Sequence, residues 1–151
     1  MIIKDIIKRI IQTTNDNRSL MPRLIVGLVF LSEGIQKFIV PELVGVGRFE
    51  RIGFENPEFL AYFVASFEIV CGVMLLAGLL TRTASIPLLV IMFTAITTTK
   101  IPILMNKGFW EMAHASRTDF AMTMLLVYLM IYGAGRLSLD WLIIKKLKHN
   151  D

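Results

Sequence analysis

The sequence is poor in the residues that bind metal ions and redox cofactors. It contains one cysteine, Cys71, which cannot form a disulfide within the chain, and two histidines, His114 and His149. No Cys/His spacing of a zinc site is present, and two histidines placed this way do not support a bis-histidine haem site. The sequence carries no flavin or iron–sulfur signature either. It therefore predicts no metal site and no resident haem, flavin or iron–sulfur cofactor.

Charge is scarce as well. Charged residues make up 19% of the chain and hydrophobic residues 55%, and the mean hydropathy is +0.65; about 45–50% apolar residues is usual in soluble domains. The net charge of +4 does not indicate nucleic-acid binding, because the basic residues stand at the ends of apolar runs without interleaved aromatic residues. The composition predicts an integral membrane protein whose main partner is the lipid bilayer.

Four segments are long enough to cross a bilayer, which takes roughly 20 predominantly apolar residues. They cover approximately residues 20–40, 59–80, 84–105 and 118–137. Pro22 and Pro87 are expected in first helical turns, and Asn56 and Pro57 are expected to be an N-cap and the first helical residue. Because a helix satisfies its own backbone hydrogen bonds in lipid, the sequence predicts an all-α, four-helix transmembrane bundle that forms one membrane domain over residues 1–151.

Amphipathic or basic segments flank the four spans. Residues 1–18 begin with MIIKDIIKRIIQ, whose isoleucines follow helical spacing opposite a charged face, so an interfacial amphipathic helix is expected there. Residues 138–151 are expected to be a basic cytoplasmic tail. The 16 lysines and arginines divide ten to six in favour of the side that holds both termini. The excess of positive charge on that side predicts that both termini are cytoplasmic.

Ionisable side chains within the spans gather toward the outer half. Glu33 and Lys37 are one helical turn apart near the outer end of the first span, and Glu68 is near the middle of the second. Lys100 lies near the end of the third span, and Asp119 opens the fourth. Because charges inside a membrane usually pair or mark a functional cavity, an outward-facing polar pocket is expected. Glu33 is expected to pair with Lys37, and Lys100 with Asp119 or Glu68; no comparable polar set is expected in the inner half.

The stretch GFWEMAHASRTDFAM, residues 108–122, is expected to start as a loop that forms the lid and wall of this pocket. Histidine can exchange a proton near neutral pH, and arginine can hold an anionic group through two parallel hydrogen bonds. The residues predicted to handle protons are Glu33, Glu68, His114 and Asp119. The residues predicted to bind a ligand are Lys37, Arg48, Lys100, Arg117 and Trp110.

Each of these assignments has a structural alternative that the sequence leaves open. The charged set could be an ion-pair network that fixes helix register, since buried ionic groups sometimes serve specificity rather than stability. His114 could be a hydrogen-bonded interface residue, and Arg48 and Arg117 could contact lipid headgroups. Trp110 fits an interfacial aromatic belt as well as a ring-stacking site.

Four motifs follow one another along about residues 20–140. They are GRFERIG after the first span, EIVCGVMLLAGLLTRTASIPLL through the second and third, TK before Pro102, and GFW followed by HASRTDF at the fourth. Together they resemble the DoxX family of small bacterial membrane proteins. The resemblance implies a four-helix protein of the bacterial inner (plasma) membrane. Relatives often carry an acid after the motif histidine, where this chain has Ala115, which weakens a proton-relay role carried over to His114.

The resemblance also implies a redox context. Some DoxX relatives resemble subunits of thiosulfate:quinone oxidoreductase, and others take part in membrane oxidoreductase complexes with thiol- or superoxide-handling partners. The leading hypothesis is therefore a membrane subunit of a redox system, whose outward pocket receives a quinone head group or a small sulfur oxyanion. Electrons would come from a partner protein or from the substrate itself.

Two other functions stay open on the sequence alone. One is a non-catalytic membrane scaffold that recruits or assembles oxidoreductase partners. The other is a solute or proton channel, which the apolar inner half of the spans disfavours. Whether the chain catalyses a reaction is undecided, and a quinone-linked oxidoreductase subunit is the enzymatic form of the hypothesis. A homodimer is compatible with the sequence.

Overall fold

The computed structural model describes residue 11 and residues 13–149 of the 151-residue chain, and every regular element in that part is helical. In chain order the elements are α2 (Leu20–Ile39), α3 (Val46–Ile52), α4 (Pro57–Ala77), α5 (Thr81–Ala95), the π-helical turn η1 (Ile96–Lys100), α6 (Ile101–Lys107), α7 (Phe109–Tyr132) and α8 (Leu139–His149). The prediction of an all-α protein is confirmed.

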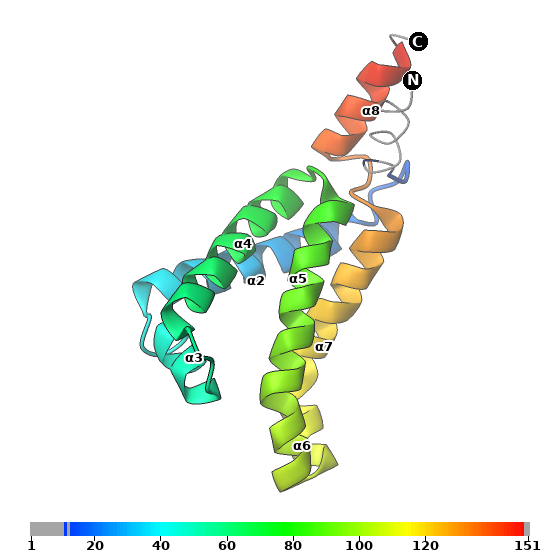
Figure 1. Cartoon of the computed structure of the whole chain (residues 1–151). Helices are drawn as coiled ribbons and strands as arrows, with labels where there is room; N and C mark the ends of the chain where they lie inside the picture. Colours follow the sequence, from blue (N-terminus) through cyan, green and yellow to red (C-terminus); the bar gives the residue numbers. More distant parts are fainter. Residues whose placement is uncertain (1–10, 12, 150–151) are drawn as a thin grey trace.

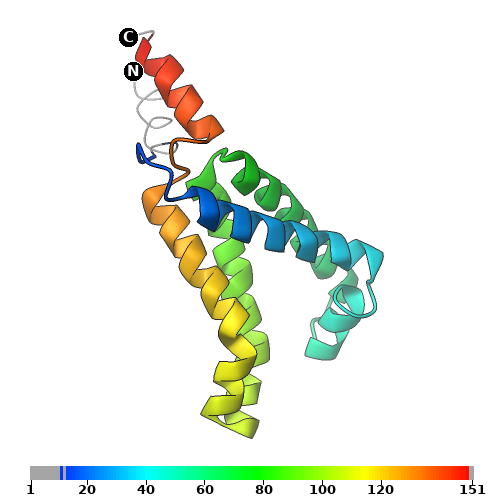
Figure 2. The same ribbon diagram turned by 180° about the vertical axis from the view of Figure 1, so that it is seen from behind.

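The long helices form two hairpins that meet at one end and diverge toward the other (Figure 1). The first hairpin pairs α2 with α4 and carries α3 at its far end; the second pairs the helix made of α5, η1 and α6 with α7. From behind, α2 and α7 also separate with distance from the end at which α8 lies (Figure 2). We call that end the junction. The four long helices are thus arranged as a V, and the sequence did not predict this divergence.

Glycines let α2 and α4 pack closely within the first hairpin. A Cβ atom added to Gly34 would lie 2.8 Å from the carbonyl oxygen of Ala65 and 2.7 Å from Cγ1 of Ile69. A Cβ atom added to Gly72 would lie 3.0 Å from the carbonyl oxygen of Gly27. Small residues at a crossing allow two backbones to approach, which is how helices commonly associate in lipid. The close approach fixes the register of α2 against α4.

Gly34→Ala is expected to destabilise this hairpin. The added methyl group would collide with the α4 backbone at Ala65, and overpacking of this kind costs roughly 1–3 kcal/mol. The measurement is the thermal midpoint of unfolding in mild detergent. Ser32→Ala, on the exposed side of the same helix, is the matched control and should leave the midpoint unchanged. Equal midpoints for the two variants would contradict the close packing.

One buried apolar cluster holds the two hairpins together. It consists of Val26, Phe30, Cys71, Leu75, Ala84, Leu88, Met92, Met122, Leu126 and Leu129. All four long helices contribute to it, with residues that lie between the junction and about the middle of each helix. The segments beyond the middle of each helix are not part of this cluster. The hydrophobic core therefore joins the hairpins at the junction and leaves their outer ends apart.

Among the residues that the structure describes, two helices are long and apolar enough to cross a membrane. Pro57–Ala77 has a mean hydropathy of 2.2, and the continuous helix Thr81–Lys107 has one of 1.9. They correspond to the second and third predicted spans. The third begins at Thr81 because the carboxylate of Asp140 accepts hydrogen bonds from two backbone N–H groups there. Pro87 consequently lies inside α5 and not in a first turn, which corrects the prediction.

The stretch expected to be a lid loop is helical instead. Gly108 turns the chain with a φ of 86°, a value that glycine adopts readily, and α7 begins at Phe109. Residues 109–117 are therefore the first turns of the helix that continues to Tyr132. The loop was predicted because charged residues interrupt the apolar run there. That prediction was wrong, since a helix that reaches the membrane surface tolerates charged residues.

The described residues cover the two predicted end segments of the chain to different extents. Most of the amphipathic helix predicted over residues 1–18 lies outside the described residues. Within the described part, residues 13–18 form bends and a turn and are not helical. The predicted tail, residues 138–151, contains α8, which starts at Leu139 beside the junction.

Candidate functional site

A buried ion pair joins α2 and α4. Nζ of Lys37 lies 2.7 Å from Oε2 of Glu68, and both side chains are buried. Oε2 of Glu33, one turn before Lys37, is 3.7 Å from the same nitrogen. Arg48 on α3 is close enough for its charge to act on Glu68. We call Glu33, Lys37 and Glu68 the Lys37 cluster. It contains the pair of Glu33 with Lys37 that the spacing predicted, and a pair of Lys37 with Glu68 that it did not.

The Lys37 cluster reaches the surface on one side only. The side chain of Glu33 is 43% exposed, whereas those of Lys37 and Glu68 are almost fully covered. Two carboxylates face one ammonium, so full ionisation leaves one negative charge to be balanced by Arg48 or by a proton. Charges at this depth in a membrane protein are usually paired in this way. The arrangement can therefore hold a proton as well as fix helix register.

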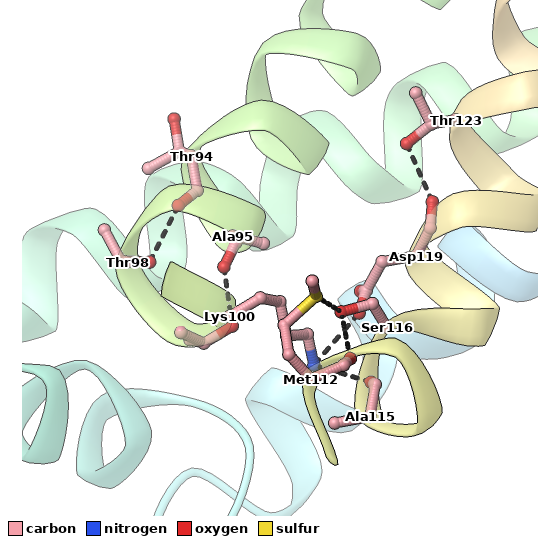
Figure 3. A network of polar contacts seen from close by, with 10 residues as sticks. Thr94, Ala95, Thr98, Lys100, Met112, Ala115, Ser116, Asp119 and Thr123 are labelled. Carbon is pink, nitrogen blue, oxygen red and sulfur yellow. Dashed lines mark hydrogen bonds and ion pairs between the residues drawn. The ribbon is translucent and has the colours of Figure 1, made fainter. Parts of the chain in front are cut away.

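A second ion pair joins the two helices of the second hairpin, one helical segment before its tip. Nζ of Lys100 lies 3.0 Å from Oδ2 of Asp119 and donates to the carbonyl oxygen of Ala115 at 2.9 Å (Figure 3). We call these three residues the Lys100 cluster. The exposed fraction is 14% for the Lys100 side chain and 23% for that of Asp119, so the pair is partly open. An ammonium has three N–H donors, and two find acceptors among the described residues. The third N–H group can donate a hydrogen bond to a ligand.

Local hydrogen bonds shape the helices around the Lys100 cluster. The three threonines at 97–99 each donate to a carbonyl oxygen one turn earlier in the same helix. On α7, the hydroxyl of Ser116 donates to the carbonyl oxygen of Met112, and that of Thr123 to the carbonyl oxygen of Asp119 (Figure 3). These hydroxyls are bound within their own helices. The ammonium and the carboxylate are thus the groups that link one helix to the other.

His114 and Arg117 form a separate contact on α7. Nη1 of Arg117 lies 3.3 Å from Nδ1 of His114, and arginine can only donate, so the histidine nitrogen accepts. Both side chains are exposed, and Trp110, one turn earlier, is 84% exposed. None of the three has a hydrogen bond or ion pair to the Lys100 cluster among the described residues. The predicted site residues of this stretch therefore occupy more than one side of α7.

The structure does not bring the predicted site residues together in one pocket. Each ion pair joins two helices of the same hairpin: Lys37 with Glu68 in the first, and Lys100 with Asp119 in the second. The hairpins diverge toward the ends that carry these pairs (Figure 1). The predicted pairing of Lys100 with Asp119 is present, and Glu68 is engaged by Lys37 instead.

Two hollows in the described surface have no residue of either cluster in their lining. A cavity of about 510 Å³ between α3 and α4 is lined by Pro41, Glu42, Val46, Gly47, Glu50, Arg51, Glu58 and Tyr62. A groove of about 280 Å³ between α4 and α5 is lined mainly by apolar residues near Cys71. No predicted site residue lines either hollow. The described residues hold no group of three or more His, Cys, Asp and Glu side chains arranged to bind a metal ion.

The junction holds a polar network that the sequence analysis missed. Arg23 is buried and donates to four carbonyl oxygens: those of Leu75 at 2.9 Å, Leu76 at 3.1 Å, Ala134 at 2.7 Å and Leu137 at 2.9 Å. It thereby ties the start of α2 to the end of α4 and to the α7–α8 linker. Arg23 is a buried charged residue at the junction end of the first predicted span, where the sequence predicts no polar set comparable to that near Lys37 and Lys100.

Asp140 on α8 forms a second set of hydrogen bonds at the junction. Its carboxylate is buried and caps the start of α5 through the N–H groups of Leu80 at 2.8 Å and Thr81 at 3.2 Å. Burial raises the pKa of Asp140 above its ordinary value; the backbone hydrogen bonds and the nearby arginines act in the opposite direction. Two sequence signals could have identified these residues: Arg23 is an arginine inside a predicted span, and Asp140 is an acid near the start of a predicted basic tail.

The comparisons with known proteins agree with the membrane character of the fold. The sequence profile of the DoxX family matches residues 19–101. An uncharacterized membrane protein of Mycobacterium tuberculosis is 53% identical over 124 residues, which are 78% of this chain and 76% of that protein. "Putative oxidoreductase CatD" of Bacillus subtilis is 29% identical over 135 residues, 88% of this chain and 92% of that protein. No solved structure matches. Because the profile covers more than half of the chain, this membrane protein belongs to the DoxX family.

Proposed function

We propose that the chain is a multi-pass subunit of a redox system in the bacterial inner membrane. The four spans would be α2, α4, the helix Thr81–Lys107 and α7, with the junction and both termini on the cytoplasmic side. The apolar character of two of these helices supports the assignment of spans, and the ten-to-six excess of basic residues in the sequence segments on the side of both termini supports the orientation. The name of the Bacillus subtilis relative, an oxidoreductase, supports the redox context.

The observation that carries this proposal is the partly open Lys100 cluster. Lys100 follows Thr81 by 19 residues, about 28 Å of helix, which places it near the far boundary of a hydrocarbon core about 30 Å thick. Its remaining N–H can donate to a quinone oxygen or to a small sulfur oxyanion that arrives from the membrane or the outer side. Asp119 is positioned to exchange the proton that the reduction of a quinone oxygen requires.

The other predicted site residues take supporting roles in this proposal. Arg117 adds positive charge to the same end of α7 and would attract an anionic ligand. Glu33 and Glu68 would pass protons at the Lys37 cluster, with Lys37 and Arg48 balancing their charge. Electrons would come from a partner protein or from the substrate.

The test is to identify the small molecules that purify with the protein in mild detergent, by extraction and mass spectrometry. A quinone or a sulfur oxyanion is expected with the wild type and is expected to be lost from a Lys100→Ala, Arg117→Ala double variant. Lys107→Ala is the matched control, because this exposed cation on α6 has no ion pair among the described residues and should not affect retention. Equal retention by the double variant and the control would reject Lys100 and Arg117 as ligand-binding residues.

A scaffold without catalysis is the second candidate, and one surface feature favours it. At the tip of the second hairpin, Met105 is 79% exposed and Trp110 is 84% exposed. Exposed methionine and tryptophan are common anchors of protein interfaces. A scaffold would retain no small ligand, and a Trp110→Ala variant would lose a partner protein that the wild type brings down. Retention of that partner by Trp110→Ala would remove this tip as the docking surface.

A further inference from the structure

The helix that carries Lys100 changes its hydrogen-bonding pattern where it reaches that residue. At the start of η1, the N–H of Ile96 donates to the carbonyl oxygen of Met92, four residues earlier. At its end, the N–H of Ile101 donates to the carbonyl oxygen of Ile96, five residues earlier. Such π-turns are rare and occur mostly as single turns inside α-helices, frequently at functional sites. A specific contact should therefore hold this turn in place.

Proline is one candidate cause, but it does not suffice. Pro102 follows η1 directly after Ile101, and in a regular α-helix its ring would approach the carbonyl oxygen of Thr98. The same continuous helix also contains Pro87, however, and the segment around that proline is α-helical throughout. What the π-turn has in addition is Lys100, whose ammonium is bound to the neighbouring helix.

The geometry around Lys100 explains how the turn and the ion pair depend on each other. A π-turn accommodates one more residue than an α-turn and so changes the direction in which the following side chains leave the helix. In this turn Lys100 points toward α7 and reaches both Asp119 and the carbonyl oxygen of Ala115 (Figure 3). In a continuous α-helix its side chain would leave about 100° away, because one residue turns the helix by that angle.

We propose that the Lys100–Asp119 ion pair holds residues 96–100 in the π-helical form, and that release of the ammonium lets the turn close to an α-helix. Closure rotates α6 by about 100° around its axis, because everything after the turn shifts by one residue. The exposed tip residue Met105 moves with α6. Any anion that takes Lys100 from Asp119 has the same effect, so the Lys100 cluster couples ligand capture to the orientation of the outer tip. This inference does not depend on the proposed function.

The test is a pair of distances measured by double electron–electron resonance in lipid nanodiscs. Spin labels are attached to cysteines introduced at Met105 and Met124, both exposed, in a Cys71→Ala background. With Lys100→Met or with Asp119→Asn, the distance between these labels is expected to change by roughly 5 Å or more, given a helix radius of about 5–6 Å with side chains. A second pair of labels, at Phe93 and Met124, reports on the hairpin before the π-turn and is expected to stay the same.

Three further variants separate the causes. Lys100→Arg keeps a cation and should preserve the wild-type distance. Lys107→Met removes a cation from α6 that has no ion pair among the described residues, and Pro102→Ala removes the ring but keeps the ion pair; neither should move the labels. Unchanged distances with both Lys100→Met and Asp119→Asn, or a shift produced by Pro102→Ala alone, would overturn the proposal. A change in the Phe93 distance would show that the hairpin opens instead, and would equally reject it.

Discussion

Arg23→Met is expected to lower the free energy of unfolding by about 3 kcal/mol or more, because leaving a single buried polar group without its partner costs about 1–3 kcal/mol. Methionine keeps the length of the side chain but removes all four hydrogen bonds to the junction carbonyls. These carbonyls belong to the end of α4 and to the α7–α8 linker, so both hairpins lose a contact at the point where they meet. The measurement is equilibrium unfolding in mixed detergent micelles, with wild type and variant side by side.

Two further arginine variants, Arg18→Met and Arg23→Lys, are the controls for this prediction. Arg18→Met removes an exposed arginine shortly before α2 and should change the free energy of unfolding by no more than about 0.5 kcal/mol. Arg23→Lys keeps the charge but lacks the planar fork that reaches several acceptors at once, so an intermediate loss is expected. If Arg23→Met were as stable as Arg18→Met, the junction network would not contribute to holding the hairpins together.

Features set by neighbouring residues could be predicted from the sequence. The apolar runs predicted the bounds of α4 and of the helix Thr81–Lys107 to within a few residues, because a run of about 20 apolar residues is typical of a membrane-spanning helix. The contact of Glu33 with Lys37 follows from four-residue spacing on one helix. The sequence limited the partner of Lys100 to Asp119 or Glu68, since both were expected at a suitable depth. Which of the two it is depends on which helices pair, and only the structure shows that.

Features set by the arrangement of the helices could not be predicted. The pair of Lys37 with Glu68 depends on the glycine contacts that bring α2 against α4, and no spacing along the chain encodes that approach. In the sequence, Arg23 is one of the 16 basic residues whose division predicts the orientation, because a basic residue near a helix end usually contacts headgroups. Its four carbonyl acceptors are 52 to 114 residues away in the sequence, so only the fold brings them together.

The largest electrostatic effect is expected from Lys37→Met. The substitution leaves the carboxylate of Glu68 buried in α4 without its 2.7 Å partner, and breaking a buried ion pair in this way costs roughly 3–5 kcal/mol. The double variant Lys37→Met, Glu68→Met removes both charges and is expected to recover most of the loss, because apolar replacements of a buried pair are often neutral or stabilising. Glu33→Gln is the control, and its partly exposed contact at 3.7 Å should contribute about 1 kcal/mol at most. The measurement is the free energy of unfolding in mixed micelles, for the wild type and the three variants.

The double variant also separates architecture from chemistry at the Lys37 cluster. If the pair only fixes the register of α2 against α4, the glycine contacts should maintain that register without charges, and the double variant should keep whatever ligand or partner the wild type retains. If the cluster handles protons, a protein of equal stability should lose the proposed redox function, since methionine cannot carry a proton. A double variant as unstable as Lys37→Met alone would contradict both, because the loss could then not come from an unpaired charge. The double variant therefore distinguishes a structural role of the Lys37 cluster from a role in proton transfer, which the stability of the single variants cannot do.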